Sequence, residues 1–294
     1  MKNVIITGGN SGLGRYTAKH LAEHGNYRII LVSRSKVKAL HAAVAITDST
    51  HNPNIVPMVC DLSSLDSIRS FVTDYRMSGF GPIDGILCTA GIDGSNHGLT
   101  GDGYDSVFQV NYLGHFLLIT SLLTMMNEHG LIALTAWDMG NYPHGGFYWP
   151  GMNALAHPSE KYATSPARYY YSKLCTFYLV NHLSRLLASI NSTLRIIIFN
   201  PGFTKTEHPT VCEYCNPVAH EQYTNVDKTA DLFARFLWDT SLSIHNGGYY
   251  NRNIHPSHAV SNAYNPEHED EVWTRSLHLV GLEQEPEGDS PTVK

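Results

Sequence analysis

Short apolar runs alternate along this chain with longer stretches in which apolar positions recur every three or four residues. The apolar runs predict strands near residues 3–7, 28–33, 55–59, 83–89, 130–136 and 194–200. The stretches between them predict helices near residues 12–24, 64–78, 111–129 and 169–190. Strands that alternate with helices are typical of a parallel sheet, because each parallel connection needs a crossover. We therefore predict an α/β fold, a doubly wound parallel sheet with helices on both faces.

The first predicted strand ends in a glycine-rich turn, TGGNSGLG at residues 7–14. Gly8 would let the backbone turn sharply, Gly12 would let it approach a pyrophosphate, and Gly14 would let the next helix press against the sheet. Unpaired backbone N–H groups at the start of that helix favour an anion. A purely structural glycine turn is the alternative, but its place between a strand and a helix predicts a dinucleotide site.

Tyr169 and Lys173 stand one helical turn apart in the run YYYSK. A free tyrosine has a pKa of ~10, which is too high for efficient proton exchange near neutral pH. A lysine ammonium beside a tyrosine stabilises the phenolate and lowers that pKa. We assign Tyr169 as general acid/base and Lys173 as the residue that tunes it. The alternative is that three consecutive tyrosines cover a helix surface, although only Tyr169 has a lysine four positions later.

These two features, with three shorter motifs, resemble the short-chain dehydrogenase/reductases. The shorter motifs are Asp61-Leu62 after the third strand, Cys88-Thr89-Ala90-Gly91 after the fourth, and Pro201-Gly202-Phe203-Thr204-Lys205-Thr206 after the sixth. The runs CDLSSLDSIRSFV, VNYLGHFLL, SKLC and VWTRSLHLVGL are most similar to the branch of retinol-dehydrogenase-like enzymes and light-dependent protochlorophyllide reductase. A length of 294 residues with 43% hydrophobic content fits one domain, and the resemblance implies that residues 1–282 form a Rossmann fold. The composition of residues 283–294 predicts a disordered tail.

The resemblance also implies functions for individual residues. The lysine at the position of Lys173 would hydrogen-bond the nicotinamide ribose, and Asn111 would hold a water in the proton relay. Asn111 opens the predicted helix, so a capping role is an alternative that is compatible with the first. The cofactor contacts implied by the resemblance are Thr7, Gly8, Asn10, Ser11, Gly12, Leu13 and Gly14 in the turn, Asp61 and Leu62 on the adenine side, Ala90, Gly91, Pro201 and Gly202, and Thr204 and Thr206 at the carboxamide.

Ser33 and Arg34, directly after the second strand, bear on which cofactor is bound. An acidic side chain there would bond the ribose 2′-hydroxyl and repel a phosphate, whereas Arg34 can pair with the 2′-phosphate of NADP. The sequence therefore favours NADP(H) over NAD(H). A solvated surface arginine is the alternative.

One position departs from the superfamily's pattern. The superfamily places a serine at the end of the fifth strand, where its hydroxyl bonds the reacting carbonyl oxygen, but this chain has Ala136 there and Thr135 before it. Losing one such donor costs roughly 10²–10³ in rate in well-studied cases. Either Thr135, a candidate catalytic residue, supplies the hydroxyl through a local shift, or a group from the following insert does. The third alternative is a protein that binds its cofactor and reduces little.

Two segments are additions to a minimal nucleotide-binding unit. An aromatic-rich insert at residues 137–168 precedes the catalytic helix, and residues 203–225, approximately, lie where the superfamily carries its substrate lid. Their rings predict a bulky, largely apolar substrate such as a retinoid, steroid, polycyclic or tetrapyrrole-like compound. The alternative is that these rings pack among themselves.

Composition narrows the function classes. A net charge of −6 without a basic cluster argues against a nucleic-acid partner. The chain leads directly into its first strand, and its longest apolar stretch, residues 116–126, is short for a bilayer. We therefore expect no signal peptide, no integral membrane segment and a cytoplasmic location. Five cysteines fit reduced thiols, with Cys60, Cys88 and Cys175 in the core.

The expected lid contains Cys212 and Cys215 in one C-x-x-C pair, flanked by His208 and His220. One such pair without a second is a weak zinc signal, so we predict no metal site. The absence of G-x-S-x-G and H-E-x-x-H motifs argues against a hydrolase.

We predict an NADP(H)-dependent oxidoreductase that transfers a hydride between nicotinamide and a carbonyl or alcohol, or a conjugated C=C bond. The alternative is a catalytically weak NADP(H)-binding sensor or interaction protein on the same fold. In the superfamily the helices that contain Asn111 and Tyr169 commonly form dimer surfaces, yet this branch includes monomers. A homodimer and a monomer therefore both remain open.

Overall fold

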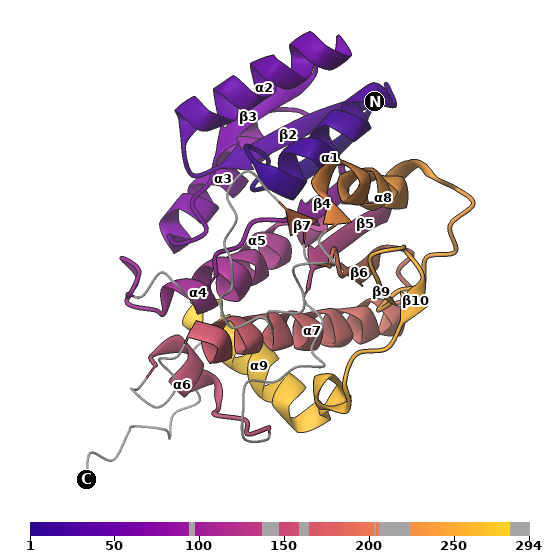
Figure 1. The fold of residues 1–294 in the computed structure, drawn as a ribbon. Helices are drawn as coiled ribbons and strands as arrows, with labels where there is room; N and C mark the ends of the chain where they lie inside the picture. Colours follow the sequence, from indigo (N-terminus) through magenta and orange to yellow (C-terminus); the bar gives the residue numbers. More distant parts are fainter. Residues whose placement is uncertain (94–97, 137–146, 159–164, 203, 206–223, 283–294) are drawn as a thin grey trace.

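The computed structural model describes residues 1–93, 98–136, 147–158, 165–202, 204–205 and 224–282. They form an eight-stranded sheet with helices on both faces (Figure 1). The strand order is β10-β9-β6-β5-β4-β1-β2-β3, and neighbours are parallel except for β9 and β10. The predicted doubly wound parallel sheet is confirmed.

The six predicted strands are present, together with short ones that the sequence pattern did not indicate. The strands of the large sheet are β1 (Lys2–Thr7), β2 (Tyr27–Ser33), β3 (Ile55–Val59), β4 (Ile83–Cys88), β5 (Met126–Thr135), β6 (Arg195–Phe199), β9 (Tyr249–Tyr250) and β10 (Pro256–Ser257). A separate pair is formed by β7 (Thr204–Lys205) and β8 (Thr224–Asn225).

The helical elements differ more from the prediction. They are α1 (Gly12–Glu23), α2 (Lys36–Thr50), α3 (Leu65–Met77), α4 (Ser106–Phe108), the π-helical η1 (Gln109–Leu113), α5 (Gly114–Leu122), the 3₁₀ turn η2 (Leu123–Met125), α6 (Met152–Ala156), α7 (Ser165–Ser189), α8 (Val226–Trp238), the 3₁₀ turn η5 (Ser261–Tyr264) and α9 (Pro266–Leu279). The helix predicted at residues 111–129 is wrong at both ends, because the helical stretch runs from Ser106 to Met125 and β5 follows at once. Helices α2, α6, α8 and α9 were not predicted.

Helix α2 escaped prediction because its buried face consists of small residues. The buried positions are mostly alanines, such as Ala39 and Ala43, whereas the larger Val37, Leu40 and Val44 are 50–63% exposed. Periodicity of large apolar residues therefore does not mark the buried face of this helix.

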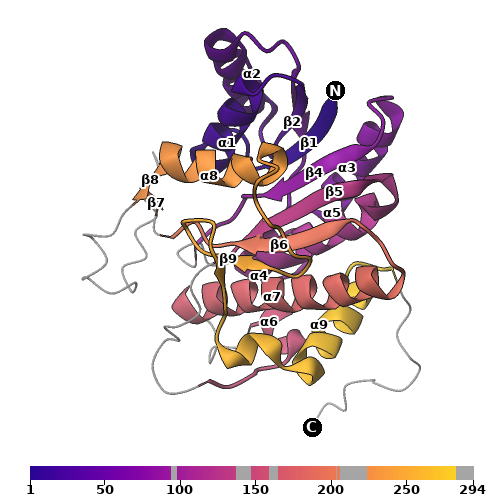
Figure 2. The ribbon, with the colours of Figure 1, turned by 90° about the vertical axis from the view of Figure 1, so that its right-hand side faces the viewer.

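Strand residues alternate between two apolar cores, since successive side chains point to opposite faces of a sheet. In β1, Val4 and Ile6 pack in the core with residues of α1, α2 and α8, whereas Ile5 packs with residues of α3, α5 and α7. Figure 2 shows these two groups of helices on opposite faces of the sheet. Burial on both faces explains why the strands read as continuous apolar runs.

The C-terminal helix α9 adds an outer layer against α7 (Figure 2). Trp273 of α9 stacks on His182 of α7 at a centroid distance of 4.3 Å and meets Phe116 of α5 edge-on at 5.4 Å. The hydroxyls of Tyr112 and Ser276 share a buried hydrogen bond of 2.7 Å. Helix α9 therefore covers a face that α5 and α7 share.

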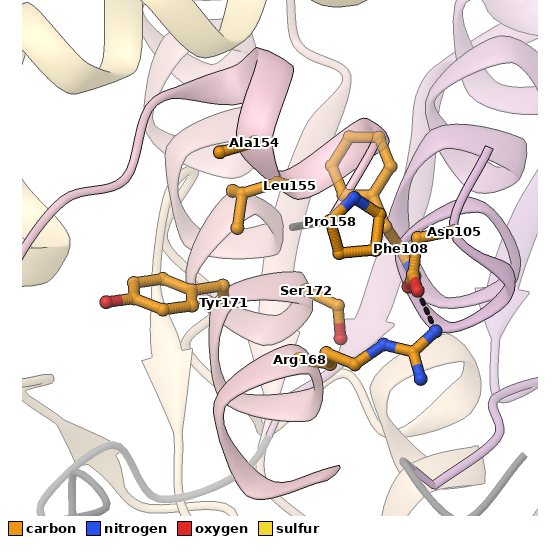
Figure 3. Close-up of a pocket in the computed structure, with 8 residues that line it drawn as sticks. All are labelled: Asp105, Phe108, Ala154, Leu155, Pro158, Arg168, Tyr171 and Ser172. Atoms are coloured by element: carbon orange, nitrogen blue, oxygen red, sulfur yellow. Dashed lines mark hydrogen bonds and ion pairs between the residues drawn. The ribbon is translucent and has the colours of Figure 1, made fainter. Parts of the chain in front are cut away.

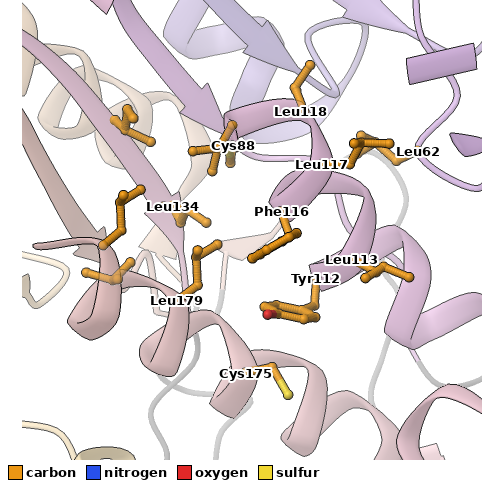
Figure 4. Packing of buried hydrophobic residues seen from close by; sticks show 14 of the residues in the cluster. Leu62, Cys88, Tyr112, Leu113, Phe116, Leu117, Leu118, Leu134, Cys175 and Leu179 are labelled. Atoms are coloured by element: carbon orange, nitrogen blue, oxygen red, sulfur yellow. The ribbon is translucent and has the colours of Figure 1, made fainter. Parts of the chain in front are cut away.

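Among the described residues, one helical stretch, Ser106–Met125, passes a length and hydropathy test for a membrane span, and 72% of its apolar window is buried. Core helices of soluble proteins pass the same test. Figure 4 shows Tyr112, Phe116 and Leu117 of this stretch within the core, and Cys88 and Cys175 are buried there as predicted. The buried helical stretch extends beyond the apolar run at residues 116–126. Polar residues in its first turns, such as Gln109 and Asn111, are buried as well.

Candidate active site

The turn between β1 and α1 is a tight cradle. Gly8 and Gly12 have φ angles of +67° and +48°, which residues with a Cβ atom rarely adopt. A Cβ atom on Gly14 would lie 2.7 Å from the carbonyl oxygen of Gly8, so α1 can approach the turn only with glycine there. The Ser11 side chain does not cap α1. This geometry fits an anion at the helix start, and the remaining turn residues Asn10 and Leu13 are half-buried beside it.

Thr7 joins the turn to the end of β4. Its hydroxyl oxygen accepts hydrogen bonds from the backbone N–H groups of Thr89, at 3.1 Å, and Ala90, at 3.2 Å. A Cβ atom on Gly8 would lie 3.0 Å from Ala90 Cα. The structure thus brings the glycine turn and the Ala90-Gly91 segment together, as the sequence motifs predicted.

Helix α7 carries Tyr169 and Lys173 to the carboxyl ends of β4 and β5. Lys173 Nζ lies 5.6 Å from the centroid of the Tyr169 ring and donates a hydrogen bond of 3.1 Å to the Thr135 carbonyl oxygen. A Cβ atom on Gly91 would lie 3.9 Å from the same nitrogen. Lys173 is only 5% exposed, and burial lowers its pKa to about 8. The lysine is therefore a buried proton donor beside a half-buried tyrosine.

Asn111 fastens the segment after β4 to α7. Its Oδ1 accepts from the Ile92 N–H at 2.8 Å, and its Nδ2 donates to the Ile92 carbonyl at 2.9 Å and to Ser172 Oγ at 3.1 Å. Ser172 in turn donates to the Tyr169 carbonyl at 2.7 Å. The expectation that Asn111 opens a helix is wrong, because it lies inside η1 and its amide holds a neighbouring loop instead of a helix end.

Thr135 is the last residue of β5, next to Lys173, and Ala136 follows it. The Thr135 hydroxyl donates to the Cys88 carbonyl at 3.0 Å, and the Ala136 N–H donates to the Phe199 carbonyl at 3.0 Å. The one hydroxyl proton of Thr135 is therefore used within the sheet. A hydrogen bond from Thr135 to a substrate would require this bond to break.

The expected adenine side is formed at the ends of β2 and β3. Ser33 is buried and Arg34 is exposed. The Asp61 carboxylate accepts from the N–H and hydroxyl of Ser63, at 2.9 and 2.6 Å, and so stabilises its own turn. The Leu62 side chain is buried and packs in the core near Leu117 and Leu118 (Figure 4).

On the other side of the site, the turn after β6 is held by Asn200. Its Oδ1 accepts from the Gly202 N–H at 2.9 Å, and Gly202 adopts a φ of +67°. The Thr204 hydroxyl donates, at 3.4 Å, toward the carbonyls of Pro201 and Gly202. Thr206 lies outside the described residues.

Most of the predicted lid, residues 206–223, also lies outside the described residues, and so do Cys212, Cys215, His208 and His220. Within the described ranges, no group of three or more His, Cys, Asp or Glu side chains could hold a metal ion. The strands β7 and β8, which flank the lid, pair with each other, so its two ends lie side by side.

The described part of the aromatic insert packs against α9. Trp149 stacks on His268 at a centroid distance of 4.8 Å, and its Nε1 donates to Glu271 Oε2 at 2.7 Å. Glu271 Oε1 accepts from the Met152 N–H at 2.8 Å. For these rings, packing within the protein is the better explanation, whereas residues 137–146 and 159–164 lie outside the described part.

A small cavity of about 10 Å³ lies between α4, α6 and α7 (Figure 3). It is lined by Asp105, Phe108, Ala154, Leu155, Pro158, Arg168, Tyr171 and Ser172. Arg168 forms an ion pair with Asp105, and both side chains are buried. The cavity has room for about one water and not for a bulky substrate. Sequence reasoning missed this pair, although Arg168 directly precedes Tyr169.

Sequence reasoning also missed His115, a buried residue that contacts both Thr7 and Asn111. It stands four positions after Asn111, so the two share one helix face. That spacing was a usable signal.

Comparison with known proteins identifies the family. A family model described as short chain dehydrogenase matches residues 2–148. Human retinol dehydrogenase 13 is 30% identical over 296 residues, which cover 96% of this chain and 85% of that protein. Human polyprenol dehydrogenase is 29% identical over 285 residues, covering 95% and 84%. The chain belongs to the short-chain dehydrogenase/reductase family.

The branch within the family is confirmed as well. Protochlorophyllide reductase A of Oryza sativa subsp. japonica is 41% identical over 123 residues, which cover 41% of this chain and 31% of that protein. A short-chain dehydrogenase from Shigella flexneri 2a, solved in complex with NADP, matches with a TM-score of 0.65 at 19% identity, covering 85% of this chain and 96% of that one. The first likeness supports the retinol dehydrogenase and protochlorophyllide reductase branch, and the second shows the fold.

Proposed function

We propose that this protein is an NADP(H)-dependent oxidoreductase that interconverts a carbonyl and an alcohol, with Tyr169 as general acid/base. The observation that carries the proposal is the position of Lys173, whose buried nitrogen lies beside the Tyr169 ring and close to Gly91. A buried ammonium between a tyrosine and a cofactor-binding loop is suited to stabilise a phenolate. Reduction of a conjugated C=C bond is a variant of the same proposal.

The residues of the glycine turn fit a dinucleotide, because Gly8 and Gly14 leave a cradle that side chains would fill. Bound NADPH would supply the hydride. Exposed Arg34 is placed at the end of β2, where it would pair with a 2′-phosphate. A structural neighbour of the same fold was solved in complex with NADP.

In the direction of reduction, the Tyr169 hydroxyl would donate its proton to the substrate oxygen. The Lys173 ammonium has three N–H groups, of which one is directed to the Thr135 carbonyl. The others remain to stabilise the Tyr169 phenolate and to bind a ribose hydroxyl. Asn111 and Ser172 hold the backbone around Tyr169 in place.

We propose a bulky, largely apolar substrate. The support comes from the relatives, since polyprenol and retinol, the alcohols in their names, are both long and apolar. A cytoplasmic location is likewise a proposal. The covering of α5 and α7 by α9 favours a monomer over a dimer formed through that face.

The test is NADPH oxidation against retinal, long isoprenoid aldehydes and short aldehydes, with Tyr169→Phe in parallel. We expect Tyr169→Phe to lower kcat by roughly 10²–10⁴-fold and to leave NADPH affinity unchanged, because only the proton donor is removed. Tyr171→Phe is the matched control, since it removes a hydroxyl of the same helix that donates to the Tyr148 carbonyl. Full turnover in Tyr169→Phe would remove the assignment.

A second candidate function is favoured by one observation. Ala136 offers no hydroxyl, and the Thr135 hydroxyl is bonded to the Cys88 carbonyl. A site without this donor would be slow, which suits an NADP(H)-binding sensor. Tight NADPH binding without turnover across the panel would favour the sensor over the enzyme.

A further inference from the structure

His115 is an ionisable side chain that lies between the glycine turn and the helical stretch that contains Asn111. It is 2% exposed within α5. Its Nε2 lies 2.9 Å from Thr7 Oγ1, and its Nδ1 lies 3.2 Å from the Asn111 carbonyl oxygen. The side chain therefore connects the glycine turn to the helix that carries Asn111.

The hydrogen bonds around Thr7 determine the tautomer of this histidine. Because the Thr7 oxygen already accepts from the N–H groups of Thr89 and Ala90, its single proton is directed to Nε2 of His115. The proton of the neutral ring must then be on Nδ1, from which it donates to the Asn111 carbonyl. Burial and the nearby Lys173 charge lower the pKa of His115 to about 4, so the ring is neutral at ordinary pH.

These contacts close a hydrogen-bonded ring around residues 89–92. Thr7 holds the first end of this segment through two N–H groups, and Asn111 holds the other end through the N–H and carbonyl of Ile92. His115 links Thr7 to Asn111 through its two ring nitrogens. Gly91 lies between them, where a Cβ atom would come within 3.2 Å of Asn111 Oδ1.

We propose that His115 is a positioning residue that locks Thr7 to Asn111 and thereby holds the Ala90-Gly91 segment in place for the cofactor. This inference rests on the proposed function in one respect, namely that NADP(H) contacts that segment. An apolar side chain of similar size would fill the space but would leave the Thr7 hydroxyl and the Asn111 carbonyl without this partner.

The first measurement is amide hydrogen exchange of the cofactor-free protein, which does not depend on any substrate. His115→Leu should speed exchange at residues 89–92 by roughly 3- to 10-fold, the range that corresponds to losing about one hydrogen bond. Thr7→Val, which removes the hydroxyl and retains the shape, should act on the same amides. In the double variant the two effects should not add, because both break the same ring.

Leu118→Ala is the matched control, because Leu118 is fully buried on the same helix and forms no bond of the ring. It should lower overall stability without selective exchange at residues 89–92. Thr7→Ser keeps the hydroxyl and should retain slow exchange. Unchanged exchange at residues 89–92 in His115→Leu would overturn the proposal, because Thr7→Val also removes the direct acceptor of two of these amides.

The second measurement is NADPH affinity by fluorescence titration. The His115→Leu variant should bind NADPH roughly 3- to 10-fold more weakly than Leu118→Ala, a difference that a loss of stability alone would not produce. Equal affinity of the two variants would overturn the positioning role. A wild-type protein that does not bind NADPH would instead contradict the proposed function, so the two failures are distinguishable.

Discussion

The two faces of the sheet bury very different side chains. The face covered by α1, α2 and α8 has an almost wholly apolar core, in which residues such as Leu21 and Phe233 are fully buried. The face covered by α3, α5 and α7 also buries amide and ionisable groups. Among the described residues these include Asp105, Gln109, Asn111, His115, Arg168 and Lys173, with Glu269 of α9 behind them, whereas Asn52 is a buried amide of the first face.

The buried polar groups affect both the stability of the fold and the chemistry of the site. A buried polar group costs free energy unless it is hydrogen-bonded, and the lowered pKa of Lys173 is a direct sign of that cost. The same burial strengthens electrostatic interactions with a reacting group. Both faces therefore contribute an apolar core, but the face covered by α3, α5 and α7 also bears the free-energy cost of the buried polar groups at the site.

The largest expected effect comes from Lys173→Met, on the polar face. We expect kcat to fall by roughly 10²–10⁴-fold, since the Tyr169 phenolate loses its stabilising charge. The free energy of unfolding at pH 7 should stay level or rise, because a buried charge is replaced by an apolar chain of similar length. Steady-state kinetics and urea unfolding check both parts. Retained turnover together with a large loss of stability would reverse the assignment of the two faces.

A pH series provides the control for this variant. Burial lowers the Lys173 pKa from 10.5 to about 8, so between these values the unfolded chain binds more protons than the native protein. The free energy of unfolding of the wild type should therefore rise with pH across this window. Relative to wild type, Lys173→Met should lack that rise. Parallel curves for the two proteins would contradict the burial of a titrating lysine.

Leu21→Ala, on the apolar face, should have the next largest effect. Removing a fully buried leucine should cost about 2–5 kcal/mol of unfolding free energy. Turnover per folded molecule should not change, because Leu21 lies about two turns along α1 from the glycine turn. Urea unfolding and kcat at a temperature where the variant is folded measure the two quantities. A specific loss of kcat would show that this face also supports catalysis.

Arg34→Glu, at the exposed edge of the same face, should have the smallest effect. We expect the preference for NADPH over NADH to fall by about tenfold or more, since a carboxylate repels the 2′-phosphate. The ratio of kcat/KM for the two cofactors measures it. Arg76→Glu, an exposed charge reversal at the end of α3, is the control. An unchanged ratio in Arg34→Glu would mean that another group reads the phosphate.

Much of the cofactor side could be predicted because its signals are local. The glycine turn, the Tyr169/Lys173 spacing and the strands all depend on neighbours within a few residues along the chain. The helix that holds Asn111 was misplaced because a short π-helical segment and polar first turns interrupt its apolar pattern. The cofactor contact of Leu62 stays a prediction, and packing against residues more than fifty positions away determines where its side chain lies.

By itself, the sequence determined the parallel α/β sheet, the glycine turn at residues 7–14 and the placement of Tyr169 and Lys173 one helical turn apart, since period, glycine conformation and helical spacing are local properties of the chain. The tertiary structure decided how these parts are joined. It directed the Thr135 hydroxyl to Cys88, turned Trp149 toward α9 and placed His115 between Thr7 and Asn111. The physical reason is that each buried polar group must find a partner, and for these groups the partner comes from a different element of the fold.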